Sequence, residues 1–338
     1  RQGKVSKWFS GIGQEAISTG VTEALDSDEY ILPLHRNLSV FTSRKVPLDR
    51  LFAQWQGKNE GFTKGRDRSF HFGTNEHKIV GMISHLGPQM GVACGIALSN
   101  KLKNNNQVTA VFTGDGGTSQ GDFHEALNLA STWNLPVIFC IENNGYGLST
   151  PVNEQYAIEN LADRGDSYGI ESHIIDGNNI IDVYSCVKSV VENMRKDSKP
   201  VLIEFKTFRM KGHEEASGQA YIDDSIIEEW AQKDPISHFE LFLLKSKYLS
   251  KKEMDAINAS TSKEIDQNWS SANSYKEVDF NIENELGDVY KEHNEGKSEP
   301  KDESLREVRL VDSIKDGIYE SMEQHDNLVI MGQDIAEY

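Results

Sequence analysis

The chain has 338 residues, of which 37% are hydrophobic, and it carries a formal net charge of −18 at pH 7. These values suit a globular protein of one large domain or two. No stretch reaches the roughly eighteen apolar residues that a membrane-spanning helix needs. So strong a negative charge also argues against binding DNA or RNA. We therefore expect neither a membrane nor a nucleic acid as a partner.

The three cysteines, Cys94, Cys140 and Cys186, share no CxxC spacing, and each lies in an apolar context. This predicts buried, reduced thiols and favours a cytoplasmic location. The chain starts at Arg1 without a methionine and without a signal peptide. Part of the N-terminus can therefore be missing. For that reason, the lack of a targeting segment is only moderate support for a cytoplasmic location.

The first third of the chain is predicted to form helices around a polar loop. Apolar residues at helical spacing predict helices over 12–26 and over 47–56, the second with a proline near its start. Residues 60–79 are polar, aromatic and glycine-rich, which predicts an irregular loop that folds over something. Small and apolar residues alternate over 87–102, as in a tightly packed buried helix.

From residue 108 to 209, predicted strands alternate with predicted helices. The strands are expected at 108–113, 137–142, 171–175 and 201–207. The helices are expected at 121–133, 154–163 and 180–196. Strands joined by crossover helices indicate the α/β class, with a doubly wound parallel sheet flanked by helices. A further helix over 225–245 should be interrupted at Asp234-Pro235.

Polar turns follow the first two of these strands. Gly114-Asp115-Gly116 comes after the first strand, and Asn143-Asn144 comes after the second. Open α/β sheets bind ligands at the carboxyl ends of their strands. A carboxylate, an amide oxygen and a backbone carbonyl are hard oxygen ligands, which can complete an octahedral Mg²⁺ site with two diphosphate oxygens and a water. The glycines let the backbone approach a diphosphate closely.

The segments Gly114–Asp122 and Glu142–Gly147, each preceded by a strand, have the pattern of thiamin diphosphate enzymes. Together they resemble the α-subunit of the decarboxylating component of 2-oxo acid dehydrogenase complexes. The resemblance covers roughly residues 6–240. It implies the thiamin diphosphate-binding fold, with thiamin diphosphate and Mg²⁺ as cofactors.

The resemblance also implies roles for individual residues. The Mg²⁺ ligands would be Asp115, Asn144 and the backbone carbonyl of Tyr146. The residues that match the cofactor-binding turns are Gly114, Gly116, Gly117, Glu142, Asn144 and Tyr146. Glu142 precedes the paired asparagines as it does in pyruvate-type relatives.

Two further segments match the cofactor site of the family. Arg36 would bind diphosphate oxygens, and His35 stands before it in place of the usual tyrosine. Ser84 and Leu86 match the segment that cups the aminopyrimidine ring, with the Leu86 side chain supporting the bent cofactor. Branched-chain relatives bind potassium through hydroxyls in this segment. Because Ile83 and a proline stand at two of those positions, we do not expect potassium.

Gly212-His213 matches the active-site histidine of the family, which makes His213 the predicted catalytic residue and a cofactor contact. Such a histidine can orient the bound adduct or move a proton at its oxygen. Glu214 follows where complexes regulated by phosphorylation carry serine, so phosphorylation there is excluded. His71, in the loop over 60–79, is a candidate for the wall of the substrate pocket.

Composition changes after about residue 246, where charged and small polar residues dominate. We predict three parts, a thiamin diphosphate-binding domain over 1–245, a charged helical arm and linker over 246–303, and an incomplete β-type domain over 304–338. Helices are expected at 251–268, at 282–293 and from 308, and a strand is expected at 327–332. The last part resembles the opening of the β-subunit, which suggests an α–β fusion.

The resemblance implies oxidative decarboxylation of a 2-oxo acid, with transfer of the acyl group to the lipoyl group of an acyltransferase partner. The glutamate that activates the aminopyrimidine would come from the β-type half, downstream of Tyr338, and the assembly would be a dimer of α–β pairs. The segments Ser84–Leu86 and Gly212–Glu215 favour branched-chain substrates of the 2-oxoisovalerate type, whereas Gly13–Ala16 and Glu142 are more similar to pyruvate or acetoin enzymes. A non-oxidative decarboxylase or carboligase with the same cofactor, and a non-catalytic fragment, remain alternatives.

Overall fold

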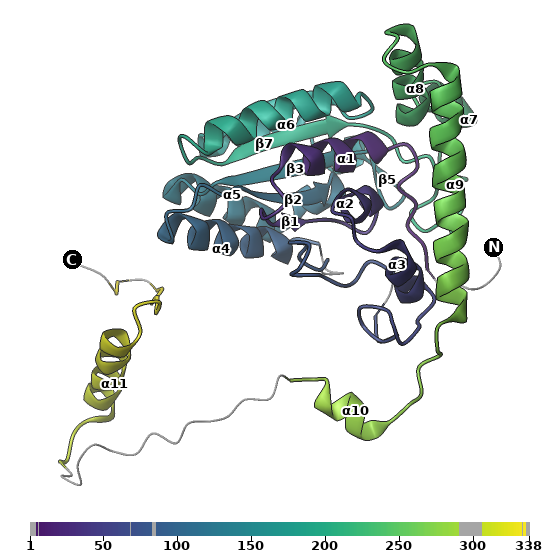
Figure 1. Ribbon diagram of the computed structural model, residues 1–338. Helices are drawn as coiled ribbons and strands as arrows, with labels where there is room; N and C mark the ends of the chain where they lie inside the picture. The colour runs from purple at the N-terminus through teal and green to yellow at the C-terminus, as the bar shows by residue number, and fades with distance from the viewer. Residues whose placement is uncertain are drawn as a thin grey trace. The chain divides into compact units, whose positions relative to one another are not determined.

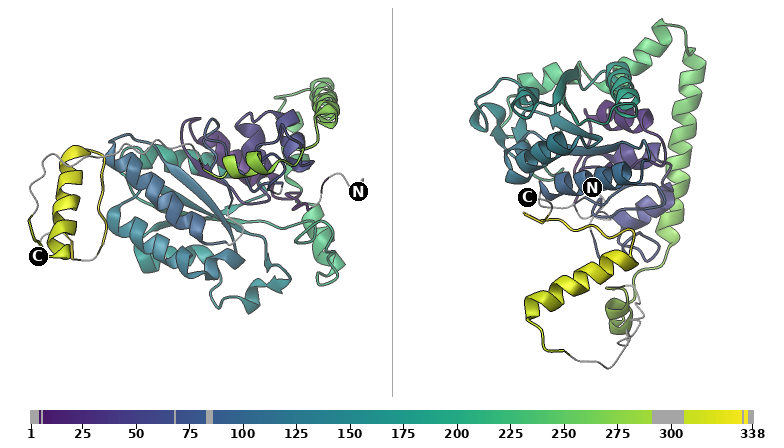
Figure 2. Two further views of the ribbon diagram at one scale, coloured as in Figure 1. Left: turned by 90° about the horizontal axis from the view of Figure 1, so that it is seen from below. Right: turned by 90° about the vertical axis from the view of Figure 1, so that its left-hand side faces the viewer.

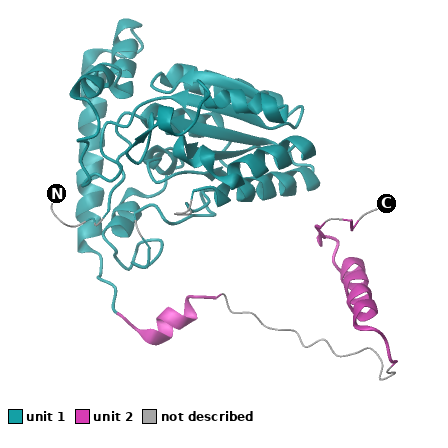
Figure 3. Ribbon diagram, turned by 180° about the vertical axis from the view of Figure 1, so that it is seen from behind, with its two compact units in different colours: residues 1–279 teal, residues 280–338 magenta. Residues whose placement is uncertain are grey.

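The computed structural model describes residue 5 and residues 7–67, 69–82, 86–290, 306–332 and 334–335. The chain divides into two compact units, residues 1–279 and residues 280–338 (Figure 3). Within the described residues, no helix combines the length and the apolar character needed to cross a bilayer.

A five-stranded parallel sheet forms the centre of the first unit, in the order β1-β2-β3-β7-β6. A short antiparallel pair, β4 and β5, follows β3. The strands are β1 (Ile31–Leu32), β2 (Thr109–Gly114), β3 (Val137–Asn143), β4 (Tyr146–Gly147), β5 (Thr150–Pro151), β6 (Glu171–Asp176) and β7 (Val201–Lys206). The predicted parallel α/β sheet is thus confirmed.

Helices cover both faces of this sheet. The α-helices of the first unit are α1 (Glu15–Ala24), α2 (Leu38–Ser43), α3 (Leu48–Trp55), α4 (Pro88–Leu102), α5 (Gly121–Trp133), α6 (Ile180–Met194), α7 (Asp224–Ala231), α8 (Pro235–Lys245) and α9 (Lys251–Ser274). Figure 1 shows α1 and α6 over one face and α4 and α5 over the other. Short 3₁₀ segments complete the unit as η1 (Gly116–Ser119), η2 (Val152–Glu154) and η3 (Leu161–Tyr168).

The sheet separates the core into two apolar clusters because successive side chains of a strand point to opposite faces. Phe112 and Ile138 belong to the cluster under α1 and α6. Val111 and Phe139 belong to the cluster under α4 and α5. Since both faces of the sheet are covered, the central strands are continuously apolar. These apolar runs are the pattern from which the strands were predicted.

Local sequence fixes several helix ends. Asp234 caps α8 by accepting a hydrogen bond from the Ser237 amide, and Pro235 occupies the first turn, so the interruption predicted within 225–245 is confirmed. Ser250 and Glu253 form a capping box at the start of α9. The described residues of the range 60–79 form no helix or named strand, as predicted.

Three expectations are wrong, and short elements were missed. Residues 154–163 form no α-helix, because the segment consists of η2, irregular backbone and the start of η3. The two-residue strand β1 was not expected. Residues 327–332 form no strand. The helix over 87–102 exists, but it is not buried all round, because Gly91, Val92 and Gly95 face solvent.

Helix α9 packs along α3 and belongs to the first unit (Figure 2). Trp269 meets Phe52 edge-on, with ring centres 5.2 Å apart. Beyond the helix, the Tyr275 hydroxyl donates to Asp49, and Glu277 pairs with Lys58. The first part of the predicted charged arm is therefore fastened to the core, and the division into three domains stays a prediction.

The second unit contains α10 (Ile282–Gly287) and α11 (Leu310–Gln324). The apolar side chains Leu310, Ile314 and Ile318 lie at helical spacing on α11 and are exposed. The linker predicted over 297–303 lies outside the described residues.

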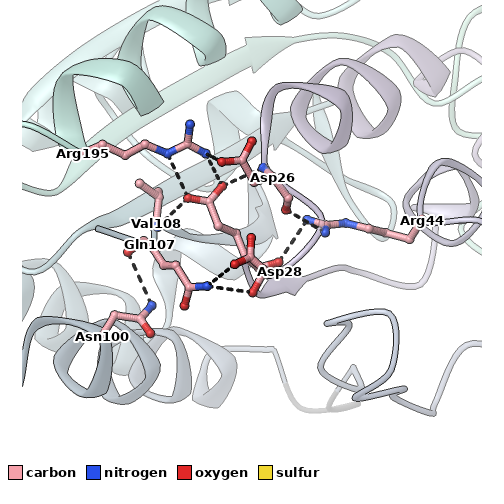
Figure 4. Close-up of polar contacts among 8 residues, drawn as sticks. Asp26, Asp28, Arg44, Asn100, Gln107, Val108 and Arg195 are labelled. Carbon is pink, nitrogen blue, oxygen red and sulfur yellow. Dashed lines mark hydrogen bonds and ion pairs between the residues drawn. The ribbon is translucent and has the colours of Figure 1, made fainter. Parts of the chain in front are cut away.

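A buried carboxylate ties the start of the sheet to the helices around it. Glu29 is 1% exposed and accepts from the backbone amides of Asp26 and Val108. Arg195, from the end of α6, binds both of its carboxylate oxygens, at 3.2 Å and 2.8 Å. Figure 4 shows Arg195 and Arg44 reaching this turn from two sides, with Arg44 donating to the Asp26 and Glu29 carbonyls. Glu29 therefore fixes the entry into β1.

Replacing Glu29 by glutamine should lower the free energy of unfolding by about 2 kcal/mol, because the buried carboxylate loses its charge-assisted hydrogen bonds to Arg195 and to two backbone amides, while Arg195 keeps its contact with Asp26. Urea denaturation followed by tryptophan fluorescence measures the change. Lys199→Ala is the matched control, since the Lys199–Asp197 pair is solvent-exposed and its loss should change little. An unchanged urea midpoint in Glu29→Gln would show that the pair is dispensable.

Candidate functional site

A cavity of about 530 Å³ opens at the carboxyl ends of four parallel strands. Residues after β1 contribute Leu34, His35 and Arg36, and residues after β2 contribute the glycine turn. The full lining consists of Phe9, Leu34, His35, Arg36, His71, Met82, Leu86, Gly114, Asp115, Gly116, Gly117, Ser119, Glu142, Asn144, Tyr146, Gly147, Leu148, Thr150, Gln155, Arg209 and His213. All the site residues predicted from the sequence line this cavity except Ser84, which lies outside the described residues.

Asp115 follows directly after β2 and is 2% exposed. Its backbone carbonyl accepts from the Thr118 amide and hydroxyl, at 3.1 Å and 2.6 Å, which folds the turn back on itself. Its side-chain Oδ2 is buried and has no hydrogen-bond partner. Burial raises the pKa of this carboxyl to about 6. A buried carboxylate oxygen without a partner is costly, and this one is left open to a ligand from outside the chain.

Beside Asp115 the cavity wall is bare backbone. A Cβ on Gly116 would lie 3.2 Å from the Gly147 Cα, and a Cβ on Gly117 would overlap the Thr113 hydroxyl. A side chain at Gly117 is therefore excluded by Thr113 of β2, and one at Gly116 would be crowded by β4. Main-chain groups can approach a bound diphosphate here without obstruction.

The end of β3 supplies the second polar turn. Asn144 Oδ1 accepts from the Tyr146 amide at 3.3 Å, which leaves a lone pair of the same oxygen for a metal ion. Glu142 is 2% exposed and accepts from the Asn37 side chain at 2.6 Å. Burial raises the pKa of Glu142 to about 7. Among the described residues, no cluster of three or more His, Cys, Asp or Glu side chains is placed to hold a metal ion. With the Glu142 carboxylate already bonded to Asn37, the remaining oxygen donors of the two turns are the Asp115 carboxylate, the Asn144 amide and main-chain carbonyls, a set that suits Mg²⁺.

Arg36 connects the two sides of the cavity. Its Nη1 donates to the Ser10 carbonyl at 3.0 Å, and its Nη2 donates to the His213 carbonyl at 2.7 Å. Burial lowers the pKa of Arg36 to about 9, with Arg209 adding to the effect, so the guanidinium is cationic at neutral pH. Arg36 therefore places a cationic guanidinium in the lining of the cavity, and its binding of diphosphate stays a prediction.

The same arginine fixes the protonation of His213. Nη2 of Arg36 lies 3.3 Å from Nδ1 of His213, and because arginine only donates, Nδ1 must accept. The proton of the neutral ring is therefore on Nε2. Burial, followed by the charge of Arg36, lowers the pKa of His213 to about 4. Near neutral pH this histidine is an uncharged Nε2–H donor.

An aromatic cluster surrounds this histidine. The ring of Phe9 lies 4.5 Å from that of His35 and 5.3 Å from that of His213. Burial lowers the pKa of His35 well below its ordinary value, so His35 is a neutral, packed ring. His71 lines the cavity, as predicted for the loop over 60–79.

The sequence analysis missed Arg209. This side chain is 2% exposed and follows β7, and it donates to the carbonyls of Leu148 and Lys211 and to the Tyr221 hydroxyl. It holds the His213 loop and brings a second buried cation to the cavity. A basic residue three positions after an apolar strand was the available signal, which is weaker than that of Asp115 directly after β2. Phe9, Met82 and Gln155 were also missed, and their residue types carry no comparable signal.

The His213 ring should stay neutral from pH 8 down to about pH 5, with a titration midpoint near pH 4, because burial and Arg36 disfavour the imidazolium. Two-dimensional ¹H–¹⁵N spectra, assigned by the resonances lost in His213→Gln, report this directly. Since the pKa is lowered in the folded chain, the unfolded chain takes up the proton first, and this histidine costs stability as the pH falls from about 6.5 to about 4. A midpoint above pH 6 would contradict the arrangement.

Comparisons with known proteins agree with this geometry. Residues 1–281 match the family model described as "Dehydrogenase E1 component". The chain is 33% identical over 268 residues to "2-oxoisovalerate dehydrogenase subunit alpha 1, mitochondrial" of Arabidopsis thaliana, an alignment that covers 78% of this chain and 57% of the relative. It thus spans less than two thirds of that relative's length.

Two bacterial relatives are covered more fully. Identity is 38% over 234 residues with the alpha subunit of the acetoin:2,6-dichlorophenolindophenol oxidoreductase of Bacillus subtilis, covering 69% of this chain and 70% of the relative. Identity is 32% over 277 residues with the "Pyruvate dehydrogenase E1 component subunit alpha" of Acholeplasma laidlawii, and the alignment covers 81% of this chain and 78% of the relative. The resemblance expected from the sequence is confirmed, and the chain belongs to the dehydrogenase E1 component family as an α-type member.

Proposed function

We propose that this chain supplies the diphosphate-binding half of a thiamin diphosphate- and Mg²⁺-dependent enzyme that oxidatively decarboxylates a 2-oxo acid. The observation that carries the proposal is the partnerless Oδ2 of Asp115, buried beside Asn144 and a glycine wall in one cavity. A divalent cation bound together with a diphosphate would satisfy that oxygen and lie against the bare backbone of the glycine turn.

Each residue then has a defined task. Asp115, Asn144 and the Tyr146 carbonyl would hold Mg²⁺, and the backbone of Gly114, Gly116 and Gly117 would face the diphosphate. Thiamin diphosphate, when bound, supplies the nucleophilic carbon and the electron sink that decarboxylation needs. Arg36 and Arg209 offset the charge of the anions, and Leu86, with Ser84 before it, supports the cofactor rings.

His213 holds its proton on Nε2 and donates it as a neutral hydrogen bond into the cavity, oriented by Arg36. A neutral donor stabilises an oxygen that gains negative charge without adding a third cation to the site. This is a positioning and proton-holding role, and it agrees with the predicted catalytic assignment of His213.

The rest of the enzyme would come from a β-type half, which supplies the carboxylate against the aminopyrimidine, in a dimer of α–β pairs. The acyl acceptor would be the lipoyl group of an acyltransferase. The names of the relatives give three candidate substrates, which are branched-chain 2-oxo acids, pyruvate and acetoin. The segments Ser84–Leu86 and Gly212–Glu215 favour a branched-chain substrate.

One set of assays separates these activities. The chain, combined with a β-type half, is given 2-oxoisovalerate, pyruvate or acetoin in turn, with a lipoyl domain or 2,6-dichlorophenolindophenol as acceptor. Acylation of the lipoyl domain with the highest kcat/KM for 2-oxoisovalerate supports the proposal. Dye reduction with acetoin favours the acetoin alternative, for which the Bacillus relative is the specific argument. CO₂ release without lipoyl acylation indicates a non-oxidative enzyme.

Replacing Asp115 by alanine should abolish Mg²⁺-dependent binding of thiamin diphosphate, with a loss of affinity of about 100-fold or more, because the site loses its only carboxylate ligand. Calorimetric titration with thiamin diphosphate, with and without Mg²⁺, measures this. Asp266→Asn is the control, since Asp266 in α9 is exposed and does not line the cavity. Equal Mg²⁺-dependent affinity in Asp115→Ala and the parent would refute the assignment.

A further inference from the structure

A path of contacts runs behind the cavity and joins the turn of Asp115 to the turn of Asn144. Its members are Thr118, Arg164, Ala162, Glu204 and Asn143. None of these five side chains lines the cavity. The path therefore connects the two halves of the proposed Mg²⁺ site without crossing the space that a ligand would fill.

The first part of the path holds the Asp115 turn. The Thr118 amide and hydroxyl both donate to the Asp115 carbonyl, and the Thr118 carbonyl in turn accepts from Nη1 of Arg164 at 2.7 Å. The Arg164 guanidinium lies 5.6 Å from the ring centre of Tyr156. The arginine is thus held against an aromatic ring, and its hydrogen bond fixes Thr118 at the end of the Asp115 turn.

The second part holds the Asn144 turn. Glu204 in β7 is completely buried, and it accepts from the Asn143 side chain at 2.7 Å and from Lys206 at 2.6 Å. The Oδ1 of Asn143 accepts from the Gly145 amide at 3.2 Å, and Gly145 has a φ of +86°. A charge inside a central strand is costly unless it is well paired. Here the carboxylate orients the asparagine that shapes the turn before Tyr146.

The short segment η3 joins the two parts. The Ala162 amide donates to the other oxygen of Glu204 at 2.9 Å, and Arg164 follows two residues later. A displacement of η3 would therefore move both turns together. Oxygen ligands that come from two separate turns bind Mg²⁺ well only when their separation is held close to octahedral geometry.

We propose that Arg164 and Glu204 are positioning residues, which hold Asp115 and Asn144 at the separation that binds Mg²⁺. The inference rests on the proposed function, because it assigns a support to that same site. Residues behind a metal's ligands typically alter metal affinity by about 10- to 100-fold when they are changed.

The test is the apparent Mg²⁺ dissociation constant at saturating thiamin diphosphate, measured by calorimetry on the chain combined with a β-type half. Arg164→Gln and Glu204→Gln should each raise it by about tenfold, and Arg164→Lys should give a smaller rise. Arg50→Gln is the matched control, since the Arg50 guanidinium also lies over an aromatic ring, that of Phe62, and does not line the cavity. It should leave the constant unchanged.

If Arg164 has only a structural role, Arg164→Gln lowers the urea midpoint but leaves the apparent Mg²⁺ dissociation constant within twofold of the parent value. That outcome overturns the inference. If Glu204→Gln does not fold, Tyr156→Phe replaces it, since it removes the hydroxyl that accepts from Asn143. A parent protein without any Mg²⁺-dependent binding contradicts the proposed function itself, whereas a binding parent with unaffected variants contradicts only this inference.

Discussion

The site depends on the register of the parallel sheet. Gly114 at the end of β2 lies beside Glu142 in β3, and Glu142 lies beside Phe205 in β7. Because all of these strands run in one direction, the residues that follow them come out at a single edge. A slip of one residue in one strand would turn Glu142 away from Asn37 and into the opposite cluster. The apolar residues that fill both faces of the sheet therefore also set the positions of the polar turns.

Much of the fold and most of the site were predictable from sequence because they depend on local signals. The strands around residues 110 and 140 are long apolar runs, and Asp115 and Asn144 come directly after them. The motif then identified Arg36 and His213, which the structure brings into the same cavity. These residues are close in space because parallel strands end at one edge of the sheet, and Arg36 and His213 were identified from the family resemblance.

The parts that sequence missed depend on tertiary contacts. Residues 154–163 have a helical pattern, but the Ala162 amide bonds to Glu204 in a distant strand, and helix is replaced by 3₁₀ turns. Strand β1 has two residues, too few for a periodic signal. The role of Arg209 is visible only when Leu148 and Tyr221, which lie far from it in sequence, are seen beside it. The neutral state of His213 also follows from a neighbour 177 residues away.

The fastening of α9 to α3 has a practical consequence for handling this protein. Composition alone places the end of the folded core near residue 245, yet Trp269 covers Phe52, and Tyr275 and Glu277 reach back to Asp49 and Lys58. A shortened chain that stops before residue 275 would uncover the aromatic side of α3 and leave Lys58, which is 8% exposed, without its acid. Exposed aromatic surface of this kind promotes self-association. The shortest well-behaved version of the first unit should therefore keep the whole of α9 and the residues up to 279.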